Sequence, residues 1–263
     1  MSSIPHVVGM VHLLPLPGSP EFNGSMDEVV ETAVSDASAL TKAGFPALMV
    51  ENFGDTPFFA DGVASETISA MTVAVTGVMD ATGVPIGVNV LRNDALSALA
   101  IAAATGAAFI RVNVLTGMMY TDQGPIVGRA SEVLRKRSAL APEIEIWADV
   151  IVKHASAPAG IDARQAAADT VERGGADAVI VSGSGTGVEP DIHEAGVVRA
   201  AVPTETRVVI GSGANADNLS RLLRAADSVI VGSSTKVDGE ARNRVDALRA
   251  ARFIEVARDE GLL

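Results

Sequence analysis

The 263-residue sequence contains no cysteine, only 3% aromatic residues and no apolar run long enough to cross a membrane. The absence of cysteine excludes disulfides, thiolate metal sites and a cysteine nucleophile, and it is typical of a reducing compartment. The N-terminus also lacks a basic region followed by an apolar stretch, which argues against a cleaved export signal. We therefore expect a cytoplasmic protein without a membrane span.

Basic side chains are few, and lysine is the rarer of the two types. The formal net charge is −12, and only four of the 20 basic residues are lysines. An acidic surface of this strength repels nucleic acid and anionic membranes, so we expect neither as a partner. The acidic excess, with abundant Ala and Val, is typical of halophilic proteins; an ordinary acidic cytosolic enzyme is the alternative. Neither interpretation excludes a local cationic pocket for an anionic substrate.

Short β-branched runs alternate with alanine-rich stretches along the whole chain. The strand-like runs are Val7–His12, Ala47–Glu51, Ile86–Val90, Phe109–Val112, Ile144–Asp149, Ala178–Val181, Val208–Ile210 and Val229–Val231. The helix-like stretches are 27–43, 64–82, 94–105, 125–140, 162–173, 192–201, 215–225 and 242–258. Eight such pairs predict an α/β fold, the (β/α)8 TIM barrel, as a single domain over residues 1–263. An open doubly wound sheet is the alternative, but the sequence contains no dinucleotide-binding fingerprint.

Three of the helix-like stretches end in glycine just before a strand-like run. The junctions are Ala43-Gly44, Thr105-Gly106 and Arg173-Gly174-Gly175. Glycine favours the left-handed conformation in which many helices end. The junctions are three versions of one helix-to-strand turn, which is the internal repeat expected of a barrel.

Two Gly/Ser turns follow the seventh and eighth strand-like runs, at Gly211-Ser212-Gly213 and Gly232-Ser233-Ser234. In TIM barrels the reactive groups lie at the C-terminal ends of the strands, and a phosphate site is often formed after strands seven and eight. We predict that the amides of both turns bind phosphate or another small anion. A helix beginning near Asn215 would add its positive end, and Lys236 would add a charge. Tight turns without a ligand are the alternative.

Titratable side chains gather at the same predicted strand ends. Glu51 and Asp149 each end a strand-like run, where either could act as a general base. Lys153 could form a Schiff base, hold a substrate oxyanion or make a surface salt bridge. The candidate catalytic residues are Glu51, Asp149, Lys153, His12, His154 and Arg111.

Arg111 lies inside an otherwise apolar run and must be paired if it is buried. We expect it to pair with Glu51 or Asp149 and to reach the substrate, with a purely structural ion pair as the alternative. The loop 182–187 alternates glycine with hydroxyl residues; it extends the anion site, folds over the substrate or is a flexible surface loop. The candidate substrate-binding residues are Asn52, Asn89, Asn113, Ser182, Ser184 and Thr186.

A metal site is not predicted, because no short-spacing pair of ligands supports one. His12 would have to combine with Glu51, Asp149 or His154, which are distant in the sequence. We predict no cofactor, and a divalent metal is the alternative left open.

Several of these segments resemble the motifs of the BtpA/SgcQ family. They are Gly9–Pro20, Val50–Phe58, Gly87–Asp94, Phe109–Asn113, Asp149–His154, Ser182–Gly187 and the two Gly/Ser turns. The resemblance covers nearly the whole chain and implies a TIM barrel related to the phosphate-binding barrels. The resemblance does not imply any particular reaction. One cyanobacterial-type member is named for photosystem I biogenesis, but nothing in this sequence indicates chlorophyll binding.

Anion donors and titratable groups thus converge on one predicted barrel mouth. We expect an enzyme that acts on a small phosphorylated sugar or nucleoside-derived substrate by lyase, aldolase, isomerase or epimerase chemistry. A non-catalytic assembly or stability factor is one alternative, because a fold alone does not determine function. A metal-assisted hydrolase of a nucleoside or phosphate ester is another. We also expect the chain to form a homo-oligomer.

Overall fold

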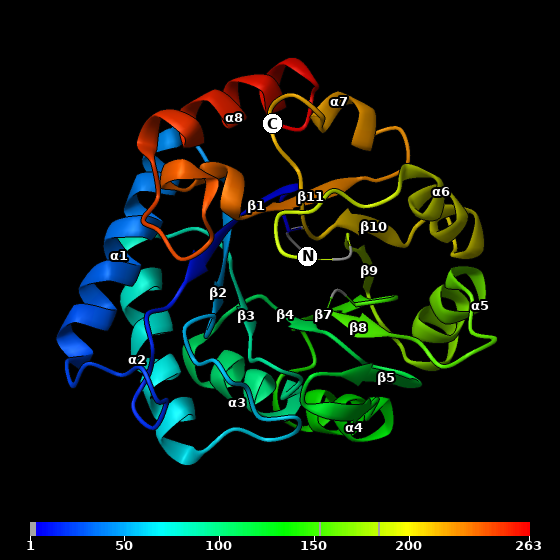
Figure 1. Ribbon diagram of the computed structural model, residues 1–263, viewed down its shortest axis with the longest axis horizontal. Helices are drawn as coiled ribbons and strands as arrows, with labels where there is room; N and C mark the ends of the chain where they lie inside the picture. Colours follow the sequence, from blue (N-terminus) through cyan, green and yellow to red (C-terminus); the bar gives the residue numbers. More distant parts are fainter. Residues whose placement is uncertain (1–3, 153, 184) are drawn as a thin grey trace.

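The computed structural model describes residues 4–152, 154–183 and 185–263. Eight parallel strands close into a barrel in the order β1-β11-β10-β9-β7-β4-β3-β2, and helices surround it (Figure 1). The strands are β1 (Val7–His12), β2 (Ala47–Glu51), β3 (Ile86–Asn89), β4 (Phe109–Val112), β7 (Glu145–Asp149), β9 (Ala178–Val181), β10 (Arg207–Ile210) and β11 (Ser228–Val231). The predicted TIM barrel is therefore confirmed, with every strand within one residue of its expected bounds.

The helices follow the strands around the barrel. They are α1 (Met26–Ala43), α2 (Ser65–Thr82), α3 (Ala95–Thr105), α4 (Ala130–Leu140), α5 (Ala163–Ala168), α6 (Ile192–Ala201), α7 (Leu219–Leu222) and α8 (Ala247–Asp259). A π-helical turn, η1 (Asp169–Arg173), continues α5, and two 3₁₀ turns, η2 (Ser233–Thr235) and η3 (Val237–Gly239), follow β11. Side-chain oxygens of Ser25, Asp94, Asp162, Asp191 and Asp246 accept hydrogen bonds from free amides in the first turns of α1, α3, α5, α6 and α8.

The C-terminal ends of three helices lie at glycine residues, as predicted. Gly44, Gly106 and Gly175 have φ angles of 112°, 83° and 67°, which is the left-handed region that side chains with a Cβ rarely occupy. At the third junction it is Gly175 that takes this conformation, whereas Gly174 has a φ of −82°. Each exit turns the chain from the outer layer into the next buried strand.

Apolar side chains pack in two main regions. The larger cluster lies between the strands and the helices, and a smaller one combines inward-facing residues such as Val8, Met49, Phe109, Trp147 and Ile230. The rings of Phe109 and Trp147 stack with their centroids 4.4 Å apart. Because side chains alternate along a strand, the next inward positions toward the C-terminal ends are polar. The apolar cluster therefore forms the floor beneath a polar barrel mouth.

Three predicted helices begin later than the sequence indicated. A hairpin, β5 (Met118–Thr121) and β6 (Gly124–Val127), takes up the first residues of the stretch 125–140. The helix α4 begins only after it, at Ala130. β5 also pairs with β8 (Ala155–Ser156), so a three-stranded antiparallel sheet lies beside the barrel. The seventh helix is limited to α7, and α8 begins five residues later than expected, after a loop tied by the Lys236–Val245 bridge.

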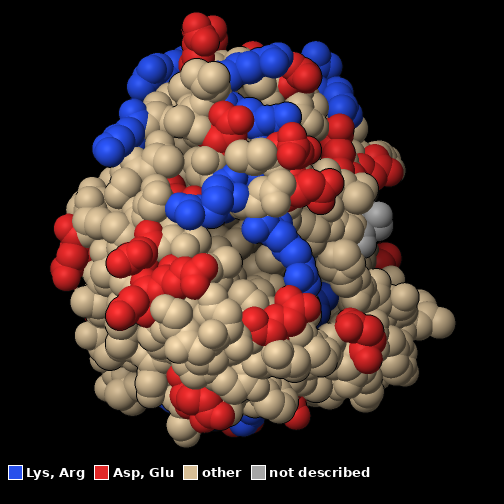
Figure 2. Space-filling view, turned by 60° about the vertical axis from the view of Figure 1, so that its left-hand side comes forward, with Lys and Arg blue, Asp and Glu red and all other residues tan. Residues whose placement is uncertain are grey.

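The surface of one face carries both kinds of charge (Figure 2). In that view most Lys and Arg side chains gather in the upper half, and the lower half carries mainly Asp and Glu. Across the described residues, no helix has the length and apolar character that a membrane crossing requires.

Candidate functional site

Inward-facing polar side chains line the C-terminal end of the barrel in register. His12 pairs with Glu51, Glu51 with Asn89, and Asn89 with Arg111 as successive strand neighbours from β1 to β4. Parallel register places these side chains together on the inner face of the barrel, beyond the apolar floor. The strand ends therefore assemble the predicted polar mouth from residues that are far apart in sequence.

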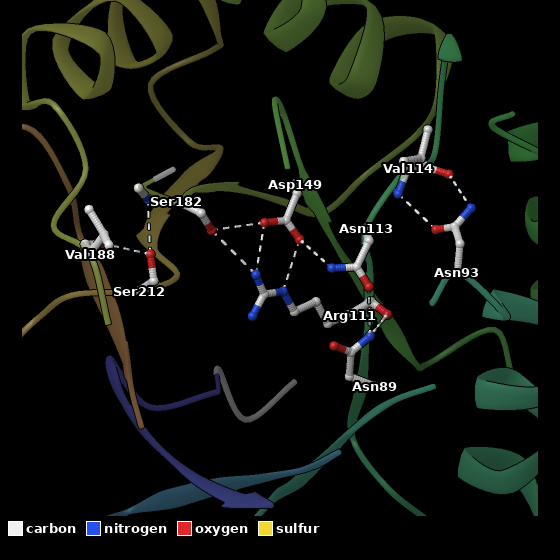
Figure 3. Close-up of polar contacts among 10 residues, drawn as sticks. Asn89, Asn93, Arg111, Asn113, Val114, Asp149, Ser182, Val188 and Ser212 are labelled. Carbon is white, nitrogen blue, oxygen red and sulfur yellow. Dashed lines mark hydrogen bonds and ion pairs between the residues drawn. The ribbon is translucent and has the colours of Figure 1, made fainter. Parts of the chain in front are cut away.

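A buried ion pair lies at the centre of this mouth (Figure 3). Arg111 Nε donates to Asp149 Oδ2 at 2.9 Å, and Arg111 Nη2 donates to Asp149 Oδ1 at 2.8 Å. Ser182 Oγ donates to Asp149 Oδ1 at 3.0 Å, and Asn113 Nδ2 lies 3.4 Å from Asp149 Oδ2. This confirms that Arg111 is paired, and of the two predicted partners it is Asp149.

Neighbouring carboxylates stabilise the charged form of Arg111. Burial opposes the charged form, but the Coulombic attraction and hydrogen bonds of Asp149, with a contribution from Glu51, outweigh it and raise the pKa of Arg111. Asn89 supports the strand by donating to the carbonyl of Arg111 at 3.1 Å and to Asn113 Oδ1 at 3.2 Å. Both oxygens of Asp149 are thus occupied, whereas the Arg111 side chain also borders a hollow of the mouth.

His12 and Glu51 form a second pair of titratable groups. His12 Nδ1 lies 2.9 Å from the carbonyl oxygen of Ala241, which can only accept, so Nδ1 carries a proton. His12 Nε2 lies 3.8 Å from Glu51 Oε1, and both side chains are nearly buried. The imidazole also stacks on Phe53 with the ring centroids 4.4 Å apart. The ring is therefore fixed on one side, and its Nε2 faces the carboxylate.

The two Gly/Ser turns meet on the same rim as these groups. Gly211, Ser212, Gly213, Gly232 and Ser233 border a small hollow of about 20 Å³. His12, Glu51 and Arg111 border the same hollow. An added Cβ on Gly211 would lie 2.3 Å from the Ile180 side chain and 2.7 Å from Ser182 Oγ. Glycine is therefore required at this position, where the backbone packs against the inner face of β9.

The hydroxyl groups of the turns have mostly structural partners. Ser212 Oγ accepts from the amide of Gly183 at 2.9 Å and donates to the carbonyl of Val188 at 3.1 Å. Ser234 Oγ donates to the carbonyl of Ala214 at 2.8 Å. Within the described residues, we find no acceptor for the backbone N–H groups of Ser212, Gly213 or Ser233. The turns thus offer amides rather than hydroxyls.

Two predicted contributions to the anion site are wrong. Lys236 is fully buried, and its Nζ lies 2.9 Å from Asp36 Oδ2 of α1, away from the mouth. Asn215 caps a turn, with its Oδ1 accepting from the amides of Asp217 and Asn218, but the α-helix that follows spans only Leu219–Leu222. The four-residue α7 therefore contributes no appreciable dipole to the turns.

The loop after β9 folds over the mouth toward His154. The amide of Thr186 donates to His154 Nε2 at 3.1 Å, which makes this nitrogen an acceptor. His154 has a φ of 55°, an unusual conformation for a residue with a side chain. An added Cβ on Gly187 would lie 2.9 Å from Ser233 Oγ, so the loop approaches the eighth-strand turn. Two predicted site residues, Lys153 and Ser184, lie outside the described residues.

A large cavity of about 740 Å³ opens beside the small hollow. Its walls come from the loops after β1 to β4, β7, β9 and β11. They are Glu21, Glu51, Phe53, Thr56, Pro57, Phe58, Leu91, Arg92, Asn113, Asp122, Gln123, His154, Thr186 and Arg242. Glu51 and Thr186 border both spaces. The large cavity and the small hollow therefore adjoin at these two residues.

Asn52 connects loops rather than lining either space. Its Oδ1 accepts from the amide of Leu91 at 2.7 Å, and its Nδ2 donates to Asp55 Oδ2 at 3.1 Å. Asp55 in turn accepts from the amide of Leu16 at 2.8 Å, and burial raises its pKa despite these hydrogen bonds. Asn52 thus holds the loops after β1, β2 and β3 together.

Groups of three His, Asp or Glu side chains close enough to hold a metal ion are absent from the part of the chain that the structure describes. The acidic groups of the mouth instead lie beside arginines. Burial lowers the pKa of Arg92 below its ordinary value, and the charges of Asp149 and Glu51 partly offset this effect.

The sequence model of the BtpA family matches residues 4–259. The chain belongs to the BtpA family. It is 47% identical over 256 residues to the "Photosystem I biogenesis protein BtpA" of Synechocystis sp., covering 97% of this chain and 88% of that protein.

Solved structures of other proteins share the fold of this BtpA-family member. Orotidine 5′-phosphate decarboxylase from Pyrococcus horikoshii aligns over 96% of this chain and 99% of its own, with a TM-score of 0.60 and 16% identity. N-(5′-phosphoribosyl)anthranilate isomerase from Pyrococcus furiosus aligns over 97% and 99%, with a TM-score of 0.56 and 11% identity. At this identity the likeness shows the barrel fold alone.

Several cavity residues of the BtpA-family chain carried no role in the sequence-based prediction. Gln123 lies in the hairpin that was expected to be loop and helix, and Arg242 lies in the loop that was expected to begin the last helix. Arg92 follows a predicted strand end directly, so the sequence already placed it among the polar residues of the mouth.

Proposed function

We propose that this BtpA-family barrel is an enzyme that acts on a small phosphorylated sugar or nucleoside-derived substrate. Its chemistry would be that of a lyase, aldolase, isomerase or epimerase. The observation that carries the proposal is the small hollow, where the two Gly/Ser turns meet Glu51, His12 and Arg111. Anion donors and a potential acid–base pair thus lie within one space, as an enzyme of phosphorylated carbonyl compounds requires.

The phosphate would bind to the two turns. Backbone amides of Ser212, Gly213 and Ser233 are available as donors, and backbone amides in a concave turn are common phosphate ligands. Arg111 borders the same hollow, and its pairing with Asp149 fixes the direction of the guanidinium and offsets much of its charge. Anion binding here therefore does not depend on Lys236 or on a helix dipole.

Of the two candidate carboxylates, we assign proton transfer to Glu51. Asp149 has both oxygens engaged by Arg111, Ser182 and Asn113, so its role is to position the guanidinium. Glu51 borders both spaces, and its Oε1 lies 3.8 Å from His12 Nε2, so the two groups reach the same part of the hollow.

An isomerase reaction shows how this pair would work. Glu51 removes a proton from the carbon next to a substrate carbonyl, and the electron pair moves to the carbonyl oxygen. Protonated His12 gives its Nε2 proton to that oxygen, forming an enediol. The reverse transfers at the neighbouring carbon complete the reaction, with His12 regaining a hydroxyl proton and Glu51 returning its proton to carbon. Arg111 stabilises the enolate charge.

The proposal is tested by proton exchange. Purified protein is incubated in D₂O with a panel of sugar phosphates, and deuterium incorporation at the carbon next to the carbonyl is followed by NMR. We expect exchange with the wild type and a loss of at least about 100-fold with Glu51→Gln. The matched control is Glu255→Gln on the exposed surface of α8. Absence of exchange and of any phosphate binding would contradict the proposal.

The second candidate is a non-catalytic assembly factor, which is favoured by the name of the Synechocystis relative, a photosystem I biogenesis protein. That role would not require proton transfer. Under this alternative, Glu51→Gln would leave the biological phenotype intact, whereas the enzymatic proposal expects the phenotype to be lost with the exchange activity.

A further inference from the structure

We propose that the large cavity is a second subsite, which binds a nucleobase-like heteroaromatic ring, so that the substrate class is a nucleoside 5′-monophosphate or a close analogue. This inference rests on the proposed phosphate site in the small hollow. The large cavity measures about 740 Å³, against about 20 Å³ for the hollow. Pockets of several hundred cubic ångströms ordinarily enclose ligands with one or more rings. A simple sugar phosphate would leave most of this space to water.

The apolar walls suit a flat ring. Phe58, Pro57 and Leu91 border the cavity, and Phe58 is half-buried. Aromatic residues form only 3% of the chain, yet both Phe53 and Phe58 lie on this cavity. The Phe53 ring already stacks on His12, which leaves Phe58 as the aromatic surface for a ligand. Stacking on an aromatic side chain is a common way to bind a base.

An unsatisfied acceptor lies in the same wall. Gln123 Oε1 is buried and has no donor among the residues that the structure describes. Gln123 Nε2 donates to Asp122 Oδ2 at the tip of the β5–β6 hairpin. A buried acceptor without a donor is unfavourable. A rotation of the side chain toward the cavity would let an exocyclic amine or ring N–H of a bound base supply the missing hydrogen bond.

The arrangement of the two spaces sets the order of the substrate's parts. Glu51 and Thr186 border both the hollow and the cavity, so they lie at the junction. A ligand with its phosphate on the turns and its ring against Phe58 would place the connecting sugar at Glu51. Phosphate, sugar and ring in that order describe a nucleoside 5′-monophosphate or a close analogue. Because the closed ribose of a nucleotide has no carbonyl, Glu51 would transfer a proton only on an analogue with an open-chain sugar.

The test compares ligands that share one part of the molecule. Inorganic phosphate, ribose 5-phosphate, adenosine and the four common nucleoside 5′-monophosphates are titrated against the protein by calorimetry. At least one mononucleotide should bind about 5- to 150-fold more tightly than ribose 5-phosphate, the range expected for one stacked base. Equal affinity for ribose 5-phosphate and all four mononucleotides would overturn the second subsite.

Matched variants locate the effect. Phe58→Ala should remove most of the mononucleotide advantage and leave the affinity for inorganic phosphate unchanged. Phe59→Ala is the control, because the neighbouring ring is 58% exposed and does not border the cavity. Equal effects of the two variants would also overturn the inference. If inorganic phosphate and ribose 5-phosphate do not bind, the proposed phosphate site is wrong as well. If both bind but no mononucleotide binds more tightly, only the second subsite is wrong.

Discussion

Replacing Asp149 with asparagine should leave the Arg111 charge buried without its counter-ion. Arg111 is 2% exposed, and two of its nitrogens donate to Asp149. Removing one partner of a buried ion pair is destabilising by about 3–5 kcal/mol. Asparagine keeps one acceptor oxygen, so we expect the lower end, about 3 kcal/mol in the free energy of unfolding. For a chain of this size that corresponds to about 6–12 °C in melting temperature.

Urea denaturation followed by fluorescence measures this loss directly. Trp147 is the single tryptophan, it is fully buried, and it lies two residues before Asp149 on β7. The control is the double variant Arg111→Met with Asp149→Leu, which removes both charges and fills the space with apolar atoms. It should recover to within about 1 kcal/mol of the wild type while phosphate binding stays lost. A loss below about 1 kcal/mol in Asp149→Asn would refute the buried-pair argument.

Three further predictions concern the turns, acid stability and salt. Gly213→Ala should weaken phosphate binding, measured by calorimetry, at least about tenfold. The reason is that Gly213 has a φ of 71° and an added Cβ would lie 2.4 Å from the Glu189 backbone. Unchanged affinity would exclude the turn as a phosphate ligand. Burial opposes the charge of Asp36, but Lys236 and Arg244 outweigh burial and lower its pKa. Its stabilising contribution is therefore complete above the pKa of the unfolded chain, near 4, and is lost as the pH falls through the lower folded value. The difference in unfolding free energy between wild type and Asp36→Asn should shrink between about pH 6 and pH 3, and a constant difference would contradict the pairing. If the net charge of −12 is an adaptation to high salt, the melting temperature should rise steadily from about 0.1 M to 2 M KCl, and a flat profile would favour the ordinary acidic enzyme.

The barrel was predictable because its strands are short, apolar on both faces and separated by helical segments. The alternation of side chains in Phe109–Val112 also predicted that Arg111 faces inward and that an acidic strand end must pair with it. Glycine at Gly44 and Gly106 marked the helix exits, since few other residues adopt the required φ. These features could be predicted because they depend on nearby residues and on the repeated strand–helix pair.

The parts that could not be predicted depend on competition between local structures and on long-range packing. Residues 125–127 have helix-compatible neighbours, but they pair with β5 as a hairpin strand. The Asn215 side chain caps the following turn, as at the start of a helix, but the α-helix there spans only Leu219–Leu222. The partner of Lys236 lies 200 residues away on α1, and sequence position alone suggested the nearer anion site.

The contact between His12 and Ala241 joins residues 229 positions apart. β1, which carries His12, also needs β11 as its neighbour to complete the barrel. A chain truncated before β11 therefore cannot close the barrel, and one truncated before residue 241 lacks the carbonyl that orients the imidazole. The His12–Glu51 pair should accordingly become functional only after both segments have been synthesised and folded onto β1.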